Sequence, residues 1–421
     1  MVTKAQVAPD VLQAQRTKQL PENLETGLHY SHLPALDGLR AVAVGLVILY
    51  HFGFSGAPGG LGVLAFFVLS GFLITWLLVK ENDARGTISI RNFYKRRVLR
   101  IFPAFYFYWL ACACLLILNG STVDWGDAAS ALVYLSNYYQ GLFRPADSFV
   151  SHTWSLAIEE QFYLLWPLFL WLGRRNLKRT AIVLSVTIVT IWFYRATIHF
   201  YGVDQGYTYR AFETRVDHLL IGCLLAIVLS RRLCTGLWSW LCSKPYLPLV
   251  TVLLLAVSSH LDKSFTYRNV IGFSVNPILV ALLIAQLIAL HSTRPWSWLE
   301  LAPIRYLGAI SYSLYLYQQV ALHPVRRMLA AHPEWLQLLA GVAVTILAAA
   351  FSYHFIEKPF LALKERSTRK ETGTTFDSTA ATLSPETWAV IAGAACTAQG
   401  RSEPHADAGK SSVVPASSCT P

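Results

Sequence analysis

The chain has 421 residues, of which 54% are hydrophobic and 14% are charged. Soluble domains average about 25% charged residues, so this composition, with several long apolar runs, excludes an ordinary soluble protein and indicates a polytopic membrane protein. A net charge of +11 would suggest nucleic acid as a partner of a soluble protein. In a membrane protein it fits cationic cytoplasmic loops, and we expect no nucleic-acid partner.

The chain begins with a polar segment, residues 1–32, which we expect to be mobile. It lacks the apolar core of a cleaved signal peptide, so the first membrane span, about 36–54, is predicted to act as an uncleaved insertion signal. A second span follows at about 61–79. The next loop, 80–100, carries seven cations, and the positive-inside rule places it and the N-terminus in the cytoplasm.

Eight further spans are predicted from the apolar runs. They lie at about 101–118, 154–172, 180–199, 216–229, 247–260, 275–291, 306–322 and 336–356. Segment 128–139 is apolar but too short to cross, and we interpret it as a re-entrant or interfacial piece. With that reading the inner loops carry more than twice as many Lys and Arg residues as the outer loops, although Arg326 and Arg327 lie in an outer loop.

The predicted fold is therefore an all-α bundle of about ten transmembrane helices over residues 33–362, with both termini in the cytoplasm. We expect it in the inner (cytoplasmic) membrane, followed by a disordered cytoplasmic tail over 363–421, which is rich in Thr, Ser, Ala and Gly. The seven cysteines show no metal-ligand spacing, and no predicted outer loop holds one. We expect neither a metal site nor a disulfide framework.

The first span carries a cation at one end, Arg40, and an imidazole near the other, His51. They are eleven residues apart, so at about 100° per residue they share one face and lie about 16 Å apart along the helix. Such a helix could connect chemistry on two sides of a membrane. The ordinary alternative is that His51 is an interfacial histidine.

A second polar group lies in the stretch HTWSLAIEEQFYLLWP, residues 152–167. Ser155 and Glu159 are four residues apart and share a helix face, whereas the adjacent Glu159 and Glu160 point about 100° apart. Glu159 is predicted at a depth similar to that of His51, where a carboxylate could orient an imidazole as a general base. The alternative is a structural glutamate that pairs with a neighbouring helix.

Two arginines precede the third span. Arg97 and Arg100 are three residues apart, neighbours on one face if helical, and guanidinium groups suit bidentate phosphate contacts. Arg40, at the same side of the membrane, could join this clamp. In span two, Ser70 and Gly71 are interpreted mainly as packing residues that let another helix approach.

Five motifs, in order over about 33–362, resemble the acyltransferase-3 family of integral membrane acyltransferases, which includes O-antigen and other polysaccharide O-acetylases. They are DGLRAVAVGLVILYHFG, GGLGVLAFFVLSGFLIT, FYKRRVLRIFPAF, HTWSLAIEEQFYLLWP and FSYHFIEKPF. The family's arginine and histidine, with ten residues between them, match Arg40 and His51. Its paired arginines match Arg97 and Arg100, and its Ser-x-x-x-Glu motif matches Ser155 and Glu159. Leu64 stands where the family often has an acidic residue.

The resemblance implies transfer of an acyl group, usually acetyl, from cytoplasmic acyl-CoA to a hydroxyl of an extracytoplasmic or lipid-linked glycan. In that reading Arg97, Arg100 and Arg40 hold the donor, His51 is the general base or is briefly acylated, and Glu159 orients it. We also predict supporting roles for Asp37, Ser155 and Glu160. The rival functions are a transporter or flippase for a lipid-linked sugar, and a scaffold or sensor. The acceptor could be a polysaccharide, a peptidoglycan precursor, a glycolipid or a small glycosylated metabolite.

Overall fold

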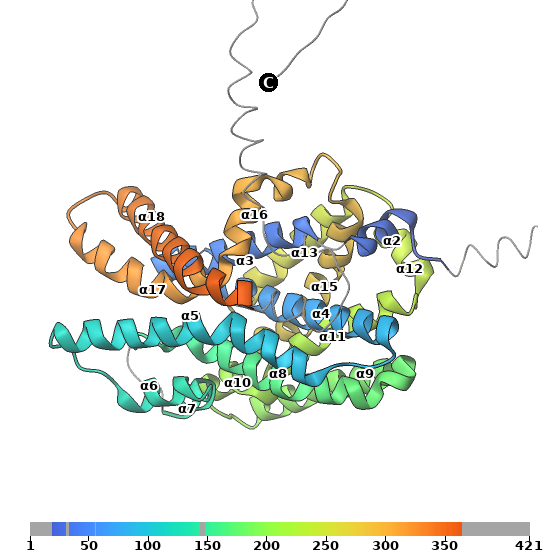
Figure 1. The fold of residues 1–421 in the computed structure, drawn as a ribbon, viewed down its shortest axis with the longest axis horizontal. Coiled ribbons are helices and arrows are strands. Elements are labelled where there is room, and N and C mark those ends of the chain that lie inside the picture. The colour runs from blue at the N-terminus through green and yellow to red at the C-terminus, as the bar shows by residue number, and fades with distance from the viewer. Residues whose placement is uncertain (1–18, 31–32, 55, 144–147, 364–421) are drawn as a thin grey trace, which may run out of the picture. The chain divides into compact units, whose positions relative to one another are not determined.

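The computed structural model describes residues 19–30, 33–54, 56–143 and 148–363. The predicted tail, apart from its first residue, lies outside the described residues. Within these ranges all regular secondary structure is helical (Figure 1), as predicted.

Each predicted span overlaps a long helix. These helices are α3 (Pro34–Phe52), α4 (Gly59–Arg85), α5 (Ile90–Leu118), α8 (Trp154–Gly173), α9 (Leu177–Phe200), α11 (Val216–Ser230), α13 (Leu247–Leu261), α15 (Phe273–Leu290), α17 (Ser311–Met328) and α18 (Glu334–Ser352). In the described residues, six helical stretches are long and apolar enough to cross a membrane. A seventh is added if α11 and α12 (Thr235–Leu241), bent by 105°, form one broken span. The chain is thus a multi-pass membrane protein, and ten crossings remain a prediction.

The centre of the bundle is the contact between α4 and α11, which lie side by side in Figure 1. A Cβ atom on Gly71 would lie 2.0 Å from the carbonyl oxygen of Leu219, and one on Gly222 would lie 2.1 Å from that of Val68. The two backbones therefore touch at both glycines, the small-residue contact typical of membrane helices. The predicted packing role of Gly71 is confirmed.

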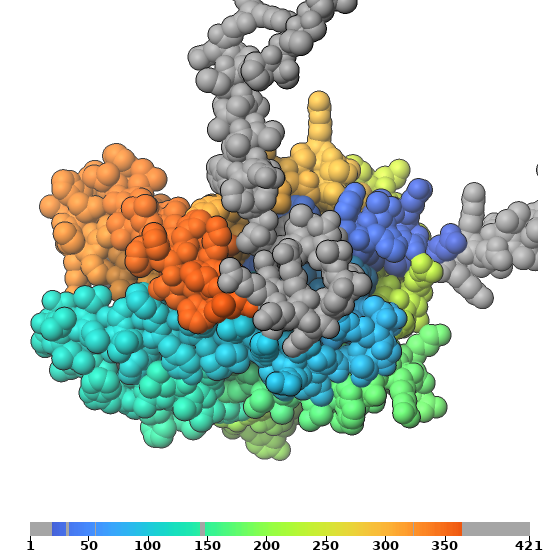
Figure 2. Space-filling model, viewed as in Figure 1, coloured from blue at the N-terminus to red at the C-terminus, as the bar shows by residue number. Residues whose placement is uncertain are grey.

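Helix α5 has a different environment. Its side chains Leu110, Leu115 and Leu118 are exposed, and Figure 2 shows α5 along one face of the molecule. Apolar side chains in such a row suit contact with lipid. The polar residues that matter for function lie at the other end of α5, in its first three turns.

The polar N-terminal segment contains a helix that the sequence did not predict. Helix α2 (Glu22–His29) packs against α15, with Leu24 and Leu28 buried and Gly27 close to the carbonyl oxygen of Ile288. The expectation of a mobile segment was wrong for these residues. Leu20, Leu24 and Leu28 recur every four residues and form one apolar stripe, which the overall polarity of the segment obscured.

Other boundaries also differ from the prediction. Most of the predicted loop 80–100 is helical, because α4 continues to Arg85 and α5 begins at Ile90. Segment 128–139 falls on two short helices, α6 (Trp125–Leu132) and α7 (Ser136–Phe143). Each has only eight residues, too few to cross a bilayer.

The span predicted at 306–322 is divided between two helices. Helix α16 (Ala302–Ala309) ends before Ile310, and α17 then continues to Met328. The two cations that opposed the charge rule, Arg326 and Arg327, therefore lie in the last turn of a helix rather than in a loop. The Arg326 guanidinium lies 5.4 Å from the centre of the Phe52 ring at the end of α3.

Candidate active site

Helix α3 carries both Arg40 and His51. It starts with Pro34, a favourable first residue for a helix, and contains Arg40 in its second turn and His51 in its last. It ends at Gly53, whose φ of 110° is readily adopted only by glycine. The chain thus fixes the two side chains on one rigid element, as predicted.

Three arginines from α3 and α5 come together. Arg100 interacts electrostatically with both Arg40 and Arg97. Because α5 begins at Ile90, Arg97 and Arg100 lie on a helix, three residues apart and on neighbouring positions of one face. The Arg97 guanidinium lies 4.6 Å from the centre of the Tyr163 ring of α8. We call Arg40, Arg97 and Arg100 the arginine cluster.

Carboxylates surround the arginine cluster. Asp37 Oδ1 lies 4.0 Å from Arg40 Nη1, one turn earlier on α3. Glu357, in the turn that follows α18, interacts electrostatically with Arg100 and Arg40 and accepts a hydrogen bond from Ser313. Asp37, for which a supporting role was predicted, lies beside Arg40 in the structure. Glu357 was not among the predicted residues.

Glu159 also belongs to this group. Its Oε1 accepts a hydrogen bond of 2.8 Å from the Ser70 hydroxyl, and its charged neighbours are Arg97, Arg40 and Arg100. Glu159 was predicted to orient His51, but its charged neighbours in the structure are arginines. It lies about two turns beyond His152, which precedes α8. Ser70, taken in the sequence as a packing residue, is the side chain that holds it.

The adjacent carboxylate, Glu160, has other surroundings. It interacts with Arg97 and Glu159 but also faces Tyr134 and Tyr106, and its Oε1 is buried without a hydrogen-bond partner among the described residues. The two glutamates therefore diverge around α8, as their spacing predicted.

Ser155 lies one turn before Glu159, near the start of α8. Its Oγ is 2.6 Å from the Tyr315 hydroxyl of α17, which in turn donates to the backbone carbonyl of His152 at 2.8 Å. Ser155 is thus part of a hydrogen-bonded link between α8 and α17. This link fixes the start of α8.

His51 has a defined tautomer. Its Nδ1 lies 2.9 Å from the carbonyl oxygen of Val47, one turn earlier. A carbonyl oxygen can only accept a hydrogen bond, so Nδ1 carries the hydrogen and Nε2 is the basic atom of the ring. The imidazole is half-buried and meets the Tyr50 ring edge-on, with 5.4 Å between centroids.

A second histidine, His152, lies close enough to interact electrostatically with His51. It is buried, and its Nδ1 lies 3.1 Å from Gln319 Oε1, which also accepts a hydrogen bond from the Ser151 hydroxyl. Its Nε2 is buried and has no hydrogen-bond partner of good geometry among the described residues, although the ring also interacts with the backbone of Leu316. As in His51, the bonded Nδ1 leaves Nε2 as the basic atom. The sequence reasoning missed His152, although it is the first residue of the HTWSLAIEEQFY motif.

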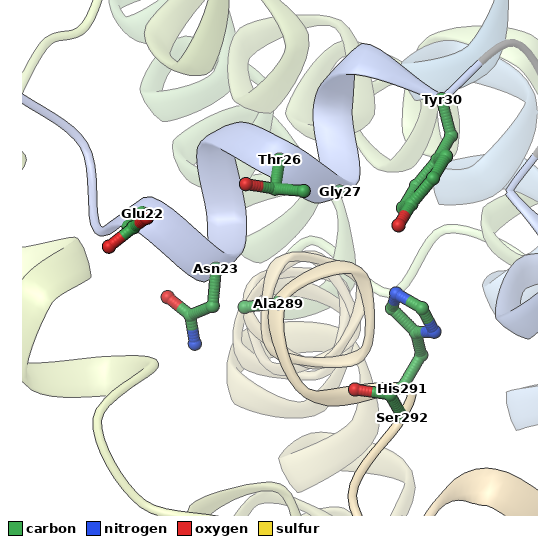
Figure 3. A pocket seen from close by; sticks show the side chains of 8 residues that line it. All are labelled: Glu22, Asn23, Thr26, Gly27, Tyr30, Ala289, His291 and Ser292. Atoms are coloured by element: carbon green, nitrogen blue, oxygen red, sulfur yellow. The ribbon is translucent and has the colours of Figure 1, made fainter.

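A separate cleft lies between α2 and the end of α15 (Figure 3). Tyr30 and His291 point toward each other across it, with ring centroids 6.0 Å apart, and Glu22 lines its other end. His291 Nδ1 also lies 2.7 Å from Glu300 Oε1. None of the predicted site residues lines this cleft.

The order and spacing of these side chains are those of a known family. A family model described as an acyltransferase domain matches residues 33–354. The chain belongs to the acyltransferase-3 family. The matched region contains the arginine cluster, both histidines and the Ser155–Glu159 pair. No solved structure matches the chain.

Curated relatives from three bacteria match most of this chain. "Putative peptidoglycan O-acetyltransferase YrhL" of Bacillus subtilis (strain 168) is 36% identical over 355 residues, 79% of this chain and 55% of the relative. Peptidoglycan O-acetyltransferase OatA of Listeria monocytogenes is 31% identical over 363 residues, 78% of this chain and 56% of the relative. O-acetyltransferase OatA of Staphylococcus aureus is 32% identical over 359 residues, 78% and 57% respectively. The chain thus spans little more than half the length of these acyltransferase-3 relatives.

Proposed function

We propose that this chain is a membrane-bound O-acyltransferase that moves an acetyl group from acetyl-CoA to a hydroxyl of a cell-wall carbohydrate. Membership of the acyltransferase-3 family supports the reaction class. The names of two relatives specify peptidoglycan, so we propose a peptidoglycan glycan as the acceptor in place of the O-antigen that the resemblance suggested. We place the protein in the cytoplasmic membrane, with the donor on the inside.

The observation that carries this proposal is the tautomer of His51. With Nδ1 bonded to the Val47 carbonyl, the lone pair of the ring is on Nε2, the form that a general base requires. The same helix carries Arg40 about 16 Å away, which suits a donor whose phosphates and thioester are separated by a long arm.

In the proposed reaction His51 Nε2 takes the proton of the acceptor hydroxyl as the hydroxyl oxygen attacks the thioester carbonyl. A C–O bond forms, the C–S bond breaks, and the departing CoA thiolate takes up the proton from the imidazolium. The products are an acetyl ester and CoA. We prefer this direct transfer to an acetyl-histidine intermediate, which adds a step. His152 Nε2, beside His51, would accept a hydrogen bond from the acceptor and hold it in place.

The arginine cluster would hold the phosphates of acetyl-CoA. Guanidinium groups suit phosphate because they offer paired donors in one plane, and Arg97 and Arg100 occupy one face of α5. Glu159, which accepts a hydrogen bond from Ser70, would offset the positive charge of the arginine cluster. The repulsion among the arginines is then smaller before the donor binds.

The test is acetyl transfer by purified protein in lipid nanodiscs. With acetyl-CoA and a peptidoglycan fragment, the wild type should release CoA only when the acceptor is present, and His51→Ala should lower the rate by about 10²-fold or more. Equal rates in a folded His51→Ala variant would remove His51 as the base.

The same assay separates the rival functions. A transporter or flippase would move its substrate without releasing CoA. A scaffold or sensor would tolerate substitution of both Arg40 and His51. If the wild type releases CoA only when the acceptor is present, and His51→Ala abolishes that release, both rival functions are excluded.

A further inference from the structure

Arg215, at the N-terminal boundary of α11, is the least satisfied charged side chain of the described residues. It has 0% exposure, and none of its three side-chain nitrogens has a hydrogen-bond partner there. A buried guanidinium that has lost its water and gained no hydrogen bond is costly, more so within a membrane protein. A group from outside the chain, either a ligand or a bound water, would satisfy these donors.

Aromatic rings enclose the guanidinium. Its central carbon lies 3.8 Å from the centre of the Phe273 ring, 5.1 Å from that of Tyr209 and 5.9 Å from that of Trp154. Cation–π contacts of this kind engage the face of the guanidinium. The N–H groups lie in its plane, so stacking alone leaves these donors unsatisfied.

The neighbouring Arg195 shows what a structural arginine in this region looks like. It is equally buried, but Nε donates to the Asn269 carbonyl at 3.1 Å, and Nη1 donates to the Thr214 carbonyl at 2.8 Å and to Asp217 Oδ2 at 2.9 Å. Its Nη2 donates to the Ser274 hydroxyl at 3.0 Å. Every nitrogen of Arg195 is satisfied by the protein itself.

Each of the two nearby aspartates has its Oδ2 in a hydrogen bond, whereas Asp217 Oδ1 and Asp262 Oδ1 have no hydrogen-bond partner among the described residues. Asp217 interacts electrostatically with Arg215, but its Oδ2 accepts hydrogen bonds from Arg195 and from Trp192 Nε1. Asp262 faces Arg268 and accepts a hydrogen bond from Asn276. Three arginines thus meet two aspartates, so cations outnumber anions here, and Arg215 donates no hydrogen bond to either aspartate among the described residues.

The position of Arg215 relates it to the proposed reaction. Trp154, in its aromatic shell, is two residues from His152 and begins α8. The first turn of α11, which follows Arg215, presents the positive end of a helix dipole, which favours an anion, and it also carries the Asp217 carboxylate. An anion bound here would lie near the start of α8, which His152 precedes, and about 14 Å along α8 from Tyr163 and the arginine cluster.

We propose that Arg215 is the anchor of an oxyanion-binding site that takes a carboxylate or phosphate group of the acceptor. The identity of the ligand as the acceptor rests on the proposed function, whereas binding of an oxyanion does not. The in-plane N–H pair of Arg215 and the first turn of α11 grip the oxyanion, and the hydroxyl to be acetylated is thereby held near His51.

Anion binding is tested by thermal unfolding of the purified protein in neutral detergent. Sodium lactate serves as the carboxylate probe and sodium phosphate as the phosphate probe, with sodium chloride of equal ionic strength as the reference. At least one probe should raise the unfolding midpoint of the wild type by about 2 °C or more as its concentration increases. Because the arginine cluster would also bind phosphate, the group is identified by the probe whose response is lost in Arg215→Met. No rise with either probe would overturn the proposal.

Arg215→Met assigns the response to this side chain. Methionine fills similar space without the unpaired charge, so the midpoint without ligand should rise while the response to the probe disappears. Arg97→Met is the control, a half-buried arginine on an aromatic ring in the arginine cluster, and it should keep the lactate response. An unchanged response in Arg215→Met would contradict the proposal. A lower midpoint in that variant, with a wild type that ignores both probes, would make Arg215 a structural cation–π residue.

If Arg215→Met fails to fold, Arg215→Lys takes its place. A lysine keeps the charge but loses the planar donor pair, so the apparent affinity for the probe should fall about tenfold, and an unchanged affinity would overturn the proposal. In the transfer assay, Arg215→Met should raise the KM for an acidic glycan about tenfold and leave that for a neutral N-acetylglucosamine oligomer unchanged. Failure of transfer to both by the wild type, with the anion response intact, would count against the proposed function alone.

Discussion

The arginine cluster is half-buried and Arg215 is fully buried, and the fold surrounds them in opposite ways. Around Arg40, Arg97 and Arg100 the fold supplies carboxylates from Asp37, Glu159 and Glu357. Around Arg215 it supplies aromatic rings and no hydrogen bond within the described residues. The carboxylates thus balance the charge of the arginine cluster without a ligand. For Arg215 we propose that a ligand completes the hydrogen bonding.

The same contrast holds for uncharged groups. Ser155 and Tyr315 form a closed set of hydrogen bonds with the backbone of His152. The ring of His152 itself has one nitrogen bonded to Gln319 and the other buried without a hydrogen-bond partner of good geometry in the described residues. Buried polar groups are normally satisfied, so unsatisfied ones near a proposed reaction indicate where substrate atoms are expected.

The largest effect we expect in a test of this comparison is at His152. His152→Ala should lower kcat/KM for the acceptor about 10²-fold and leave the KM for acetyl-CoA unchanged, because the lost contact is with the acceptor. Initial rates at varied acceptor concentration measure this, normalised to folded protein. His260→Ala, an exposed histidine at the end of α13, is the control. A wild-type value for His152→Ala would mean that its unpaired nitrogen has no substrate partner.

A smaller effect is expected in the arginine cluster, where carboxylates already compensate the charge. Arg97→Ala should raise the KM for acetyl-CoA about tenfold, the loss of about 1.4 kcal/mol of charged hydrogen bonding, with little change in kcat. Arg91→Ala, an exposed arginine in the first turn of the same helix, should behave as the wild type. If both variants leave the KM unchanged, the arginine cluster is structural and acetyl-CoA binds elsewhere.

The sequence predicted what depends on local period. The ten helices, the shared helix of Arg40 and His51, the paired face of Arg97 and Arg100 and the divergence of Glu159 and Glu160 all follow from hydrophobic run lengths and from residue spacing. The short helix α2 was not predicted, because three leucines spaced four residues apart are a weak signal within a polar segment.

What the sequence could not predict is which distant side chains meet. Glu159 is bonded to Ser70, 89 positions earlier, and His152 to Gln319, 167 positions later. Neither pair has a periodic signal, because helix packing decides which faces meet. The lack of hydrogen bonds at Arg215 could not be predicted either, because it becomes visible only once every neighbouring side chain has been placed.

The smallest expected effect concerns Asp127 in α6, a buried group outside the candidate spans and away from the proposed reaction. Its Oδ1 accepts a hydrogen bond of 3.0 Å from Gln140, while Oδ2 has no partner among the described residues. Burial raises the pKa of Asp127 above its ordinary value, against the opposing effects of hydrogen bonds from Gln140 and Ser148 and of the nearby Arg210.

Asp127 therefore tests whether every unsatisfied buried group serves a ligand. Because its pKa is higher in the folded than in the unfolded protein, its contribution to stability is full at low pH and is lost as the pH rises through the folded pKa. Asp127→Asn keeps the acceptor for Gln140 and removes the charge, so it should slightly raise the unfolding midpoint at pH 8, and the difference should shrink toward pH 5. Acetyl transfer should be unchanged. A large loss of transfer with no gain in stability would mean that Asp127, like Arg215, awaits a ligand, and that the unsatisfied groups extend to α6.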